Sequence, residues 1–352
     1  MSLDALLRVT RGGLDLDLPL SAGDGEVVAV LGPNGAGKTT ALHALAGLVH
    51  LSPGGHVRVD DETWADERTH ADPSLRRVGL LAADHLLFPH LSARANVAFG
   101  PRSRGVSRPD AVARADAELT ALGAGDLADR RPGALSHGQA QRVAIARALA
   151  TDPRLLLLDE PLSALDPELR PQVRATLAAR LRTFPGSTVL VTHDPLDALT
   201  LADHLVFLED GRVVQEGSPA DVVARPRNAY VAHVVGLNLY AGTASANDTV
   251  STALGPVVTL GHEHRGASWV AFAPSAVALY PHRPDGSTRN TWPVRVGDVE
   301  LVGQSARVRL VTGGGATVIA EVTPASVAAL RLHPGTELWA GVKATEVSAY
   351  PA

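Results

Sequence analysis

The chain has 352 residues, of which 45% are hydrophobic and 20% charged, and this balance predicts two or three packed domains instead of a disordered polypeptide. The formal net charge of −5 gives no reason to expect a nucleic-acid partner. Cysteine is absent, which excludes disulfides, thiolate metal sites and a cysteine nucleophile. No apolar run approaches the roughly 20 residues that span a bilayer, and Met1–Arg8 does not have the pattern of a signal peptide. We therefore expect other chains to do any membrane spanning.

The first motif along the chain is a glycine-rich loop that fits the pattern G-x-x-x-x-G-K-[ST] at every fixed position. An apolar run at Glu26–Leu31 predicts a buried strand before the loop, and Thr40–Leu48 predicts a helix after it. This arrangement directs backbone N–H groups and the positive end of a helix at a triphosphate. Lys38 would reach the β- and γ-phosphates, and the Thr39 hydroxyl would bind Mg²⁺. The predicted cofactor-binding residues are Gly32, Pro33, Asn34, Gly35, Ala36, Gly37, Lys38, Thr39 and Thr40.

A second anion site is predicted where Leu135–Gln139 precedes a run of helix formers at Ala140–Ala150. Ser136 has the residue type and position of an N-cap, so a hydroxyl and a glycine stand at a helix N-terminus.

Two further strands end in groups that suit phosphate chemistry. Arg154–Glu160 is so apolar that it predicts a strand buried on both faces, and it ends in Asp159 and Glu160. Ligands of open α/β sheets bind beyond the carboxyl ends of strands, so Asp159 would face the Mg²⁺ held by Thr39. Glu160 would polarise the attacking water. Thr188–Asp194 is a β-branched strand that ends in His193.

In order and spacing, the phosphate loop, Leu-Ser-His-Gly-Gln at 135–139 and the acidic strand end resemble the ATPase subunit of ABC transporters. The resemblance covers residues 1 to about 235 and implies an α/β P-loop NTPase with a RecA-like core and a helical subdomain. Ser163–Asp166 resembles the D-loop of that family, and the histidine after the 188–192 strand resembles its H-loop. The neutral imidazole of His193 would contact the γ-phosphate and hold the water and Glu160 in line.

The resemblance also implies how the protein works. Two copies face each other, with ATP between the phosphate loop of one copy and the signature residues of the other. We therefore expect a homodimeric ATPase that uses ATP and Mg²⁺, is peripheral at the cytoplasmic face of the membrane, and drives permease subunits, with a solute-binding protein as an indirect partner. The implied residues at this seam are Ser136, His137, Gly138, Gln139 and Asp166.

Two departures from the family pattern stand out. The family places a glutamine after the strand Val78–Leu81, and Ala83 occupies that position here. Either Asp84 takes the role or the site works without it, so we expect weakened metal contact and low basal turnover. The adenine-stacking aromatic is also missing near Arg11. Either the guanidinium plane of Arg11 stacks on the adenine, or the site has no stacking partner there. The segment 86–100 still resembles the permease-docking region, although Phe88, Leu91 and Phe99 suit core packing equally well.

Beyond Gly236 helical periodicity gives way to short alternating runs separated by glycine-rich turns, with one short helix predicted at Pro324–Leu330. This pattern favours a small OB-like β-barrel. We expect an ABC-type domain at 1–235, a strand-rich connecting region at 236–288 and the barrel domain at 289–352.

Two stretches that bracket this barrel, Ser287–Asn290 and Val342–Val347, resemble the molybdate-binding Mop/TOBE domain. The chain has only two lysines, Lys38 and Lys343, which singles out Lys343 as a compact cation for an oxyanion. Molybdate or a similar oxyanion is the implied ligand, and the alternative is a barrel that regulates or dimerises and binds nothing. The implied oxyanion residues are Ser287, Arg289, Lys343 and Thr345.

The function that these features favour is the ATP-hydrolysing subunit of a molybdate importer. One alternative keeps the class and changes the cargo to sulfate, iron, sugar or polyamine. Another is a catalytically weakened oxyanion sensor, against which the presence of Glu160 and His193 argues. An ABC-type ATPase of DNA repair or translation would need a long coiled coil or a second cassette, and the sequence has neither.

Overall fold

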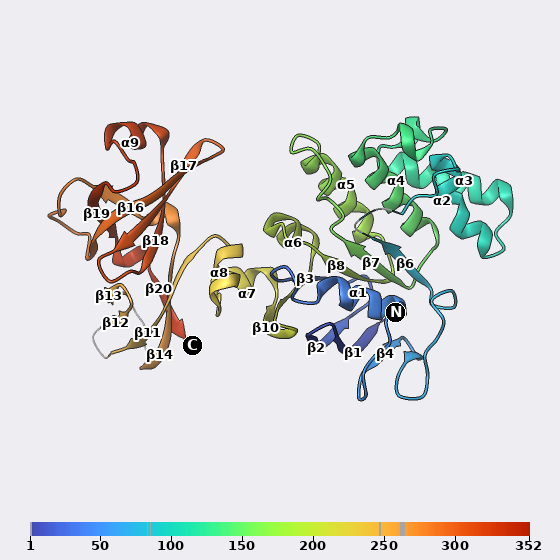
Figure 1. The fold of residues 1–352 in the computed structure, drawn as a ribbon, viewed down its shortest axis with the longest axis horizontal. Coiled ribbons are helices and arrows are strands. Elements are labelled where there is room, and N and C mark those ends of the chain that lie inside the picture. The colour runs from blue at the N-terminus through green and yellow to red at the C-terminus, as the bar shows by residue number, and fades with distance from the viewer. Residues whose placement is uncertain (1, 83, 85, 246–247, 261–264) are drawn as a thin grey trace. The chain divides into compact units, whose positions relative to one another are not determined.

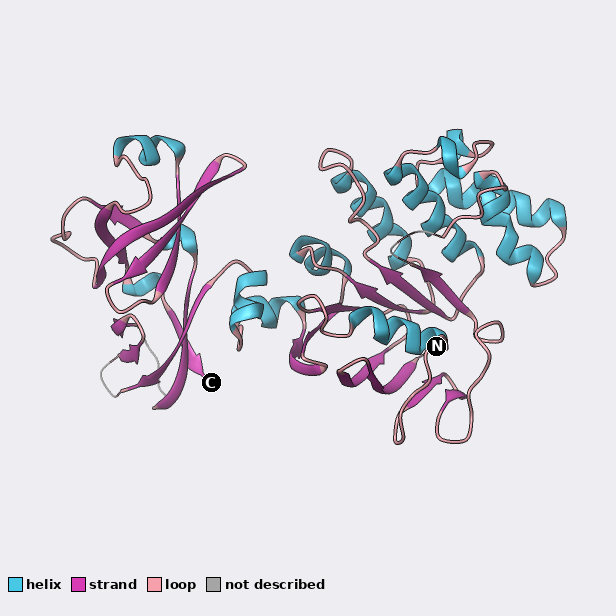
Figure 2. Cartoon of the chain, viewed as in Figure 1, coloured by secondary structure: helices cyan, strands magenta, loops and turns pink. Residues whose placement is uncertain are grey.

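The computed structural model describes residues 2–82, 84, 86–245, 248–260 and 265–352 (Figure 1). The chain divides into two compact units, Met1–Val222 and Val223–Ala352, which we call the first and second units. The first unit mixes helices with strands, whereas the second consists mainly of strands (Figure 2).

A ten-stranded sheet forms the centre of the first unit. Its strands are β1 (Leu3–Arg11), β2 (Leu14–Ala22), β3 (Val27–Leu31), β4 (His56–Val59), β5 (Glu62–Ala65), β6 (Val78–Leu81), β7 (Leu155–Asp159), β8 (Ser187–Val191), β9 (His204–Glu209) and β10 (Arg212–Gly217). The order is β5-β4-β1-β2-β10-β9-β3-β8-β7-β6. Strands β6, β7, β8, β3 and β9 run parallel, whereas β1 pairs antiparallel with β2 and β4.

Strands β3, β7 and β8 are buried at every residue, as their unbroken apolar runs predict for a parallel sheet covered on both faces. Because these three strands are parallel neighbours, their carboxyl ends meet at one edge of the sheet. The predicted strands that carry the phosphate loop, the acidic pair and the histidine are therefore confirmed and lie side by side.

The helices of this part of the chain are α1 (Lys38–Ala46), α2 (Ala93–Ser103), α3 (Arg108–Ala121), α4 (His137–Ala150), α5 (Arg170–Arg182), α6 (Pro195–Leu201) and α7 (Pro219–Ala224). Figure 1 shows α2, α3 and α4 grouped together, away from the antiparallel strands β1, β2 and β4, and the three helices pack on one another. Side chains of Ser92, Ser107, Ser136 and Asp194 cap the N-termini of α2, α3, α4 and α6.

A buried arginine closes the C-terminal end of α1. Arg76, just before β6, is 1% exposed. Its guanidinium donates to the carbonyls of Ala44 (3.2 Å) and Leu45 (2.9 Å) in α1 and of Trp64 (3.2 Å) in β5. Gly47 lies against it, since a Cβ there would be 2.6 Å from Arg76 Nε. The helix that starts at the phosphate loop is thus fixed at its far end by a cation.

The second unit contains two five-stranded antiparallel sheets, ordered β13-β12-β11-β14-β20 and β15-β19-β16-β17-β18. Residues 236–288, expected as a connecting region, supply β11 to β15 and share one apolar core with β16 to β19. Its elements are α8 (Ala229–Val234), β11 (Asn238–Ala244), β12 (Thr249–Thr252), β13 (Gly255–Val258), β14 (Gly266–Phe272), β15 (Ala278–Tyr280), β16 (Asn290–Val302), β17 (Ser305–Thr312), β18 (Thr317–Val322), α9 (Pro324–Ala329), β19 (Glu337–Val342) and β20 (Ser348–Pro351). Helix α9 confirms the one short helix predicted there.

The two sheets exchange their last strands. Strand β14, a 3₁₀ turn and β15 match β19, a 3₁₀ turn and β20, and both segments carry a tryptophan and a tyrosine at the same spacing. Strand β20 pairs with β14 and β15 pairs with β19, so Tyr350 lies opposite Trp269 and Tyr280 lies opposite Trp339. The second unit is therefore an internal repeat with a two-fold pattern of pairing.

Two buried asparagines repeat the same exchange. The Asn238 side chain exchanges two hydrogen bonds with the main chain of Ile319, at 2.9 and 2.8 Å. The Asn290 side chain does the same with Val258, at 2.9 and 2.7 Å. Each half of the repeat thus supplies one side-chain amide that hydrogen-bonds to the main chain of a strand in the other half.

Candidate functional site

The phosphate loop is shaped by close backbone contacts. Gly32 follows β3 so closely against β9 that a Cβ would be 2.1 Å from the Leu208 oxygen. Gly37 has φ of 105° at the start of α1, a left-handed conformation that favours glycine. The Lys38 ammonium donates to the carbonyls of Gly32 (2.8 Å) and Pro33 (2.9 Å). Burial lowers the pKa of Lys38 from its ordinary value. The loop therefore folds around a partly desolvated cation.

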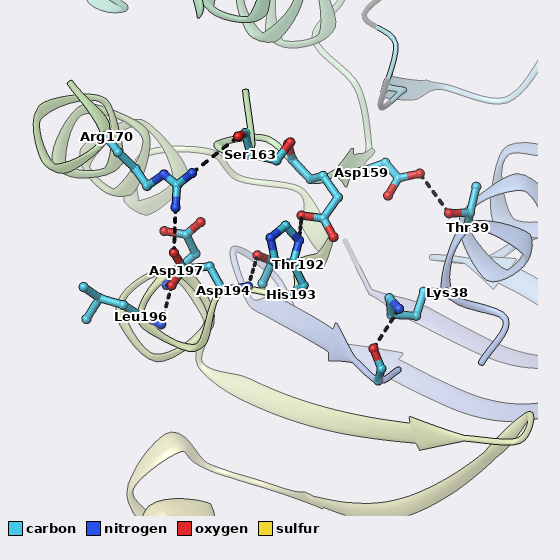
Figure 3. A network of polar contacts seen from close by, with 12 residues as sticks. Lys38, Thr39, Asp159, Ser163, Arg170, Thr192, His193, Asp194, Leu196 and Asp197 are labelled. Atoms are coloured by element: carbon cyan, nitrogen blue, oxygen red, sulfur yellow. Dashed lines mark hydrogen bonds and ion pairs between the residues drawn. The ribbon is translucent and has the colours of Figure 1, made fainter. Parts of the chain in front are cut away.

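Thr39 and Asp159 meet across the sheet edge, as predicted (Figure 3). The Thr39 hydroxyl donates to Asp159 Oδ2 over 3.1 Å, and Asp159 is 5% exposed. Burial raises the pKa of this carboxyl above its ordinary value, so its charged form is disfavoured without a cation beside it. A hydroxyl and a carboxylate are hard oxygen donors that fit Mg²⁺. Among the described residues no group of three or more His, Cys, Asp or Glu side chains is placed to hold a metal ion, and phosphate and water would complete the shell of Mg²⁺ here.

Glu160 and His193 form a pair, with His193 Nδ1 2.7 Å from Glu160 Oε2 (Figure 3). Glu160 has φ of 52°, which is strained for a residue with a side chain. Its main chain is held on both sides: its N–H donates to Val191 O (2.9 Å), and its carbonyl accepts from Gln141 Nε2 (3.0 Å) and Ser163 Oγ (2.9 Å). This strained residue is therefore fixed by contacts from β8, α4 and the turn after β7.

The phosphate loop and the two acidic residues at the end of β7 line a cavity of about 290 Å³. Most of the predicted phosphate-loop residues contribute to it, as do Asp159 and Glu160, whereas His193 is not among its lining residues. Leu14, from the stretch in which the family's aromatic was expected, lines the cavity, whereas Arg11 does not. The lining residues are Leu14, Asn34, Gly35, Gly37, Lys38, Thr39, Thr40, Asp159, Glu160 and Val191.

The second predicted anion site lies at the start of α4, outside this cavity. Ser136 caps the helix in a reciprocal box: its hydroxyl accepts from Gln139 N (3.3 Å), and Gln139 Oε1 accepts from Ser136 N (3.0 Å). Ser136 and His137 are exposed, and Gly138 packs so closely on Leu165 that a Cβ would be 2.9 Å from the leucine side chain. Asp166 is also exposed and absent from the cavity. One chain therefore presents these residues to its surroundings.

In the second unit, one of the four predicted oxyanion residues lines a cavity of about 310 Å³. Lys343 lies there with the hydroxyl-bearing Ser275 and Thr288 and with Glu346. Ser287, Arg289 and Thr345 do not line this cavity. Ser275 comes from the turn between β14 and β15, the counterpart of the turn that holds Thr345, and the repeat was the sequence signal that would have found it.

Comparison with known proteins decides the family. The family model described as "ABC transporter" matches residues 16–163, and the TOBE domain model matches residues 286–349. The Molybdenum import ATP-binding protein ModC of Mycobacterium tuberculosis is 42% identical over 98% of this chain and 97% of its own length. This chain belongs to the ABC transporter family.

Two other similar ABC proteins match a smaller share of the chain. The Fe(3+) ions import ATP-binding protein FbpC of Streptomyces coelicolor is 41% identical over 77% of this chain and 76% of its own length. A solved dimeric ATP-binding cassette in a post-hydrolysis state with ADP and Pi is 28% identical, with a TM-score of 0.54, over 62% of this chain and 99% of its own. The chain is thus an ATP-binding ABC ATPase with an α/β P-loop core and a TOBE domain of antiparallel sheets. Among the described residues no helix is long and apolar enough to cross a membrane.

The expected docking segment of this ABC chain is partly apolar on its surface. Phe99 and Leu86 are 48% and 61% exposed, whereas Phe88 is half-buried with its ring 4.6 Å from that of Phe99. Packing thus describes Phe88, and docking stays a prediction for this segment. Ala83, at the expected glutamine position, lies outside the described residues.

Sequence reasoning missed three side chains that the structure brings to this site: Leu14, Gln141 and Arg170. Gln141 and Arg170 contact segments far away in sequence, so no local pattern indicates their partners. Leu14 stands in a strand whose alternation predicts burial but not a ligand.

Proposed function

We propose that this ABC protein is the ATP-hydrolysing subunit of an importer, acting as a homodimer at the cytoplasmic face of the membrane beneath permease subunits. A solute-binding protein would be an indirect partner that delivers the cargo. The observation that carries the proposal is the Glu160–His193 pair beside the Thr39–Asp159 contact at one sheet edge. Water activation and cation binding would thus be adjacent, as phosphoryl transfer to water requires.

In this proposal each residue has a separate task. Lys38 and the N–H groups of the phosphate loop bind the β- and γ-phosphates, and Thr39 and Asp159 would hold Mg²⁺, which would supply positive charge beside the phosphates. Glu160 orients the attacking water, and His193 holds Glu160 in line with the γ-phosphate. Hydrogen bonds from Gln141 and Ser163 hold the left-handed main chain of Glu160, and its carboxylate lies beside His193, which favours positioning as the source of the rate.

The dimer is proposed because Ser136, His137, Gly138 and Gln139 lie outside the cavity formed by their own chain. The N-terminus of α4, where Ser136 and His137 are exposed, suits a phosphate of the nucleotide bound to the second copy. Asp166, exposed in the turn before α5, would lie at the same seam.

Molybdate is the proposed cargo, because the ModC relative matches both units, including the TOBE domain. Lys343 and nearby hydroxyls would bind a tetrahedral oxyanion in the second unit, with Ser287, Arg289 and Thr345 as the further ligands proposed from the sequence. The carboxylate of Glu346 in the same cavity opposes an anion, so occupancy would depend on Lys343. A different solute is the second candidate, since relatives named for iron and spermidine/putrescine import also match.

The dimer is tested with Glu160→Gln, which keeps the side-chain shape and removes the carboxylate charge. We expect this variant to form a stable dimer in saturating Mg-ATP and a monomer without nucleotide, measured by light scattering after size-exclusion chromatography. The control is Lys38→Ala in the same background, which should remain monomeric. A Glu160→Gln chain that stays monomeric in Mg-ATP, with and without its permease, would contradict the proposal.

The cargo is tested by isothermal titration of molybdate, tungstate and sulfate into the full chain. We expect molybdate and tungstate to bind, and Lys343→Ala to abolish binding without changing ATP affinity. Flat traces for all three anions would remove the support that the second unit gives to molybdate.

A further inference from the structure

Arg170, the first residue of α5, connects the two segments that flank the Glu160–His193 pair (Figure 3). Its Nη2 donates to the main-chain oxygen of Ser163 over 3.3 Å, in the turn after β7. Its Nη1 donates to Asp194 Oδ2 over 3.0 Å, in the turn after β8. The pairing of β7 with β8 ends at Asp159 and Val191. Beyond that point the Arg170 guanidinium bridges the turns that follow the two strands.

These contacts form a closed ring that enters Glu160 at its main-chain carbonyl and leaves it at its carboxylate. On one side the Ser163 hydroxyl donates to the Glu160 carbonyl over 2.9 Å. On the other side Asp194 directly follows His193, whose Nδ1 lies 2.7 Å from the Glu160 carboxylate. A displacement of Arg170 would therefore act on both the backbone and the side chain of Glu160.

The two oxygens of Asp194 have separate partners. Oδ1 accepts from the N–H groups of Leu196 (2.8 Å) and Asp197 (3.3 Å) and so caps α6, whereas Oδ2 accepts from Arg170. The Asp194 N–H donates to Thr192 Oγ1 over 3.1 Å. The histidine turn is therefore anchored to its own helix by one oxygen and to the turn after β7 by the other.

A neighbouring arginine supplies an internal comparison. Arg174, one turn further along α5, lies 2.6 Å from Asp197 and 3.8 Å from Asp194, and none of its contacts reaches Ser163. Arg174 thus joins α5 to α6, whereas Arg170 alone of the two joins both loops.

The environment makes the Arg170 contacts effective. The side chains of Arg170 and Asp194 are only 26% and 21% exposed, so solvent screens their pairing less than it screens a surface pair. Arg170 Nε is buried and has no hydrogen-bond partner within the described part of the chain, which leaves the two Nη atoms to hold the group. A planar fork meets two acceptors at a fixed angle, which a lysine cannot do.

We propose that Arg170 is a positioning residue of ATP hydrolysis, which holds the Glu160–His193 pair in register by tying the turn at Ser163 to the turn at Asp194. The proposal rests on the proposed catalytic roles of Glu160 and His193. It does not require Arg170 to touch nucleotide.

The first test is steady-state ATPase kinetics of the full chain with Arg170→Gln. We expect kcat to fall about tenfold, with the KM for ATP within about twofold of the starting value. Arg170→Lys should recover only part of kcat, because an ammonium reaches one of the two acceptors. Arg174→Gln is the matched control, and it should lower the unfolding temperature while leaving kcat within about twofold.

The second test asks whether Arg170 acts through His193. In a His193→Ala background, Arg170→Gln should lower kcat by much less than tenfold, because only the route through Ser163 to the Glu160 main chain is left to lose. If Arg170→Gln does not fold, Asp194→Asn carries the same expectation, since it keeps the cap of α6 and removes the acceptor for Arg170.

A full tenfold loss in the His193→Ala background, or an unchanged kcat for Arg170→Gln, would overturn the role of Arg170. Absence of ATPase activity in the parent chain would instead count against the proposed function.

Discussion

Gln141 donates from Nε2 to the main-chain oxygen of Glu160 over 3.0 Å. Gln141 is 1% exposed and lies in α4, whose N-terminus carries Ser136 and His137. The helix proposed to contact the nucleotide of a second copy is thus bonded to the residue proposed to act on water in its own site. A shift of α4 on dimer closure would reach Glu160 directly.

Replacing Gln141 by Met should lower the ATPase rate without a large change in the stability of the fold. The variant keeps the side-chain length and removes the donor, and it also removes Oε1, a buried oxygen without a partner among the residues described. These two effects oppose each other, so we expect the free energy of unfolding to change by no more than about 1 kcal/mol. The ATPase kcat should fall severalfold. A kcat equal to that of the parent chain would show that the contacts with Val191 and Ser163 are enough to hold Glu160.

Asp159→Asn should stabilise the nucleotide-free protein at neutral pH. Burial raises the pKa of Asp159 in the folded state. At a pH between the unfolded and the folded pKa, the folded chain therefore keeps a proton that the unfolded chain has lost. Stability therefore falls as the pH rises from the unfolded pKa through the folded pKa, and the charged carboxylate remains a cost above it. Asparagine removes that cost, so the unfolding temperature of the variant should lie above that of the parent chain.

This gain should shrink as the pH is lowered towards 4 and should reverse in Mg-ATP, because the variant loses a cation ligand. Scanning calorimetry at several pH values, with and without Mg-ATP, measures both effects. A variant that is less stable than the parent at pH 7.5 without nucleotide would rule out the cost assigned to burial.

Arg76→Met should destabilise the first unit strongly, by about 3 kcal/mol, because carbonyls at the end of α1 lose a buried donor. The neighbouring Arg77→Met is the control, since Arg77 is exposed and should cost no more than about 0.5 kcal/mol. Urea unfolding followed by circular dichroism measures both. Equal losses for the two variants would mean that the cap on α1 contributes little.

Ala83→Gln should raise ATPase activity severalfold and lower the Mg²⁺ concentration needed for half-maximal rate, because the family's metal-contacting amide is restored. The Asp84→Asn variant distinguishes the alternative, in which Asp84 supplies this contact and its loss lowers the parent rate. Rates measured across a Mg²⁺ series check both. If Ala83→Gln leaves rate and Mg²⁺ dependence unchanged, the expected weakness of metal contact is wrong.

The nucleotide site was predictable because its signals are local. The phosphate loop, the Ser136 cap and the acidic end of β7 each show residue types at fixed spacing beside an apolar run, and the strand order then brings them together. Contacts such as that of Arg170 with Asp194 join elements that are separated in sequence, so no local pattern indicates that the two residues meet. In the second unit the strands were visible, but their exchange depends on a repeat whose halves differ at most positions.

The exchanged edge strands also bear on how the chain is made. Residues 268–271 of β14 pair with β11 on one side and with 348–351 of β20 on the other, so the second side stays unpaired until the intervening polypeptide has left the ribosome. Pairing over such a long separation is slow, and a half-synthesised second unit exposes an unpaired rim that other nascent chains can join. Biogenesis of this part of the molecule should therefore depend on chaperones more than that of the nucleotide-binding half.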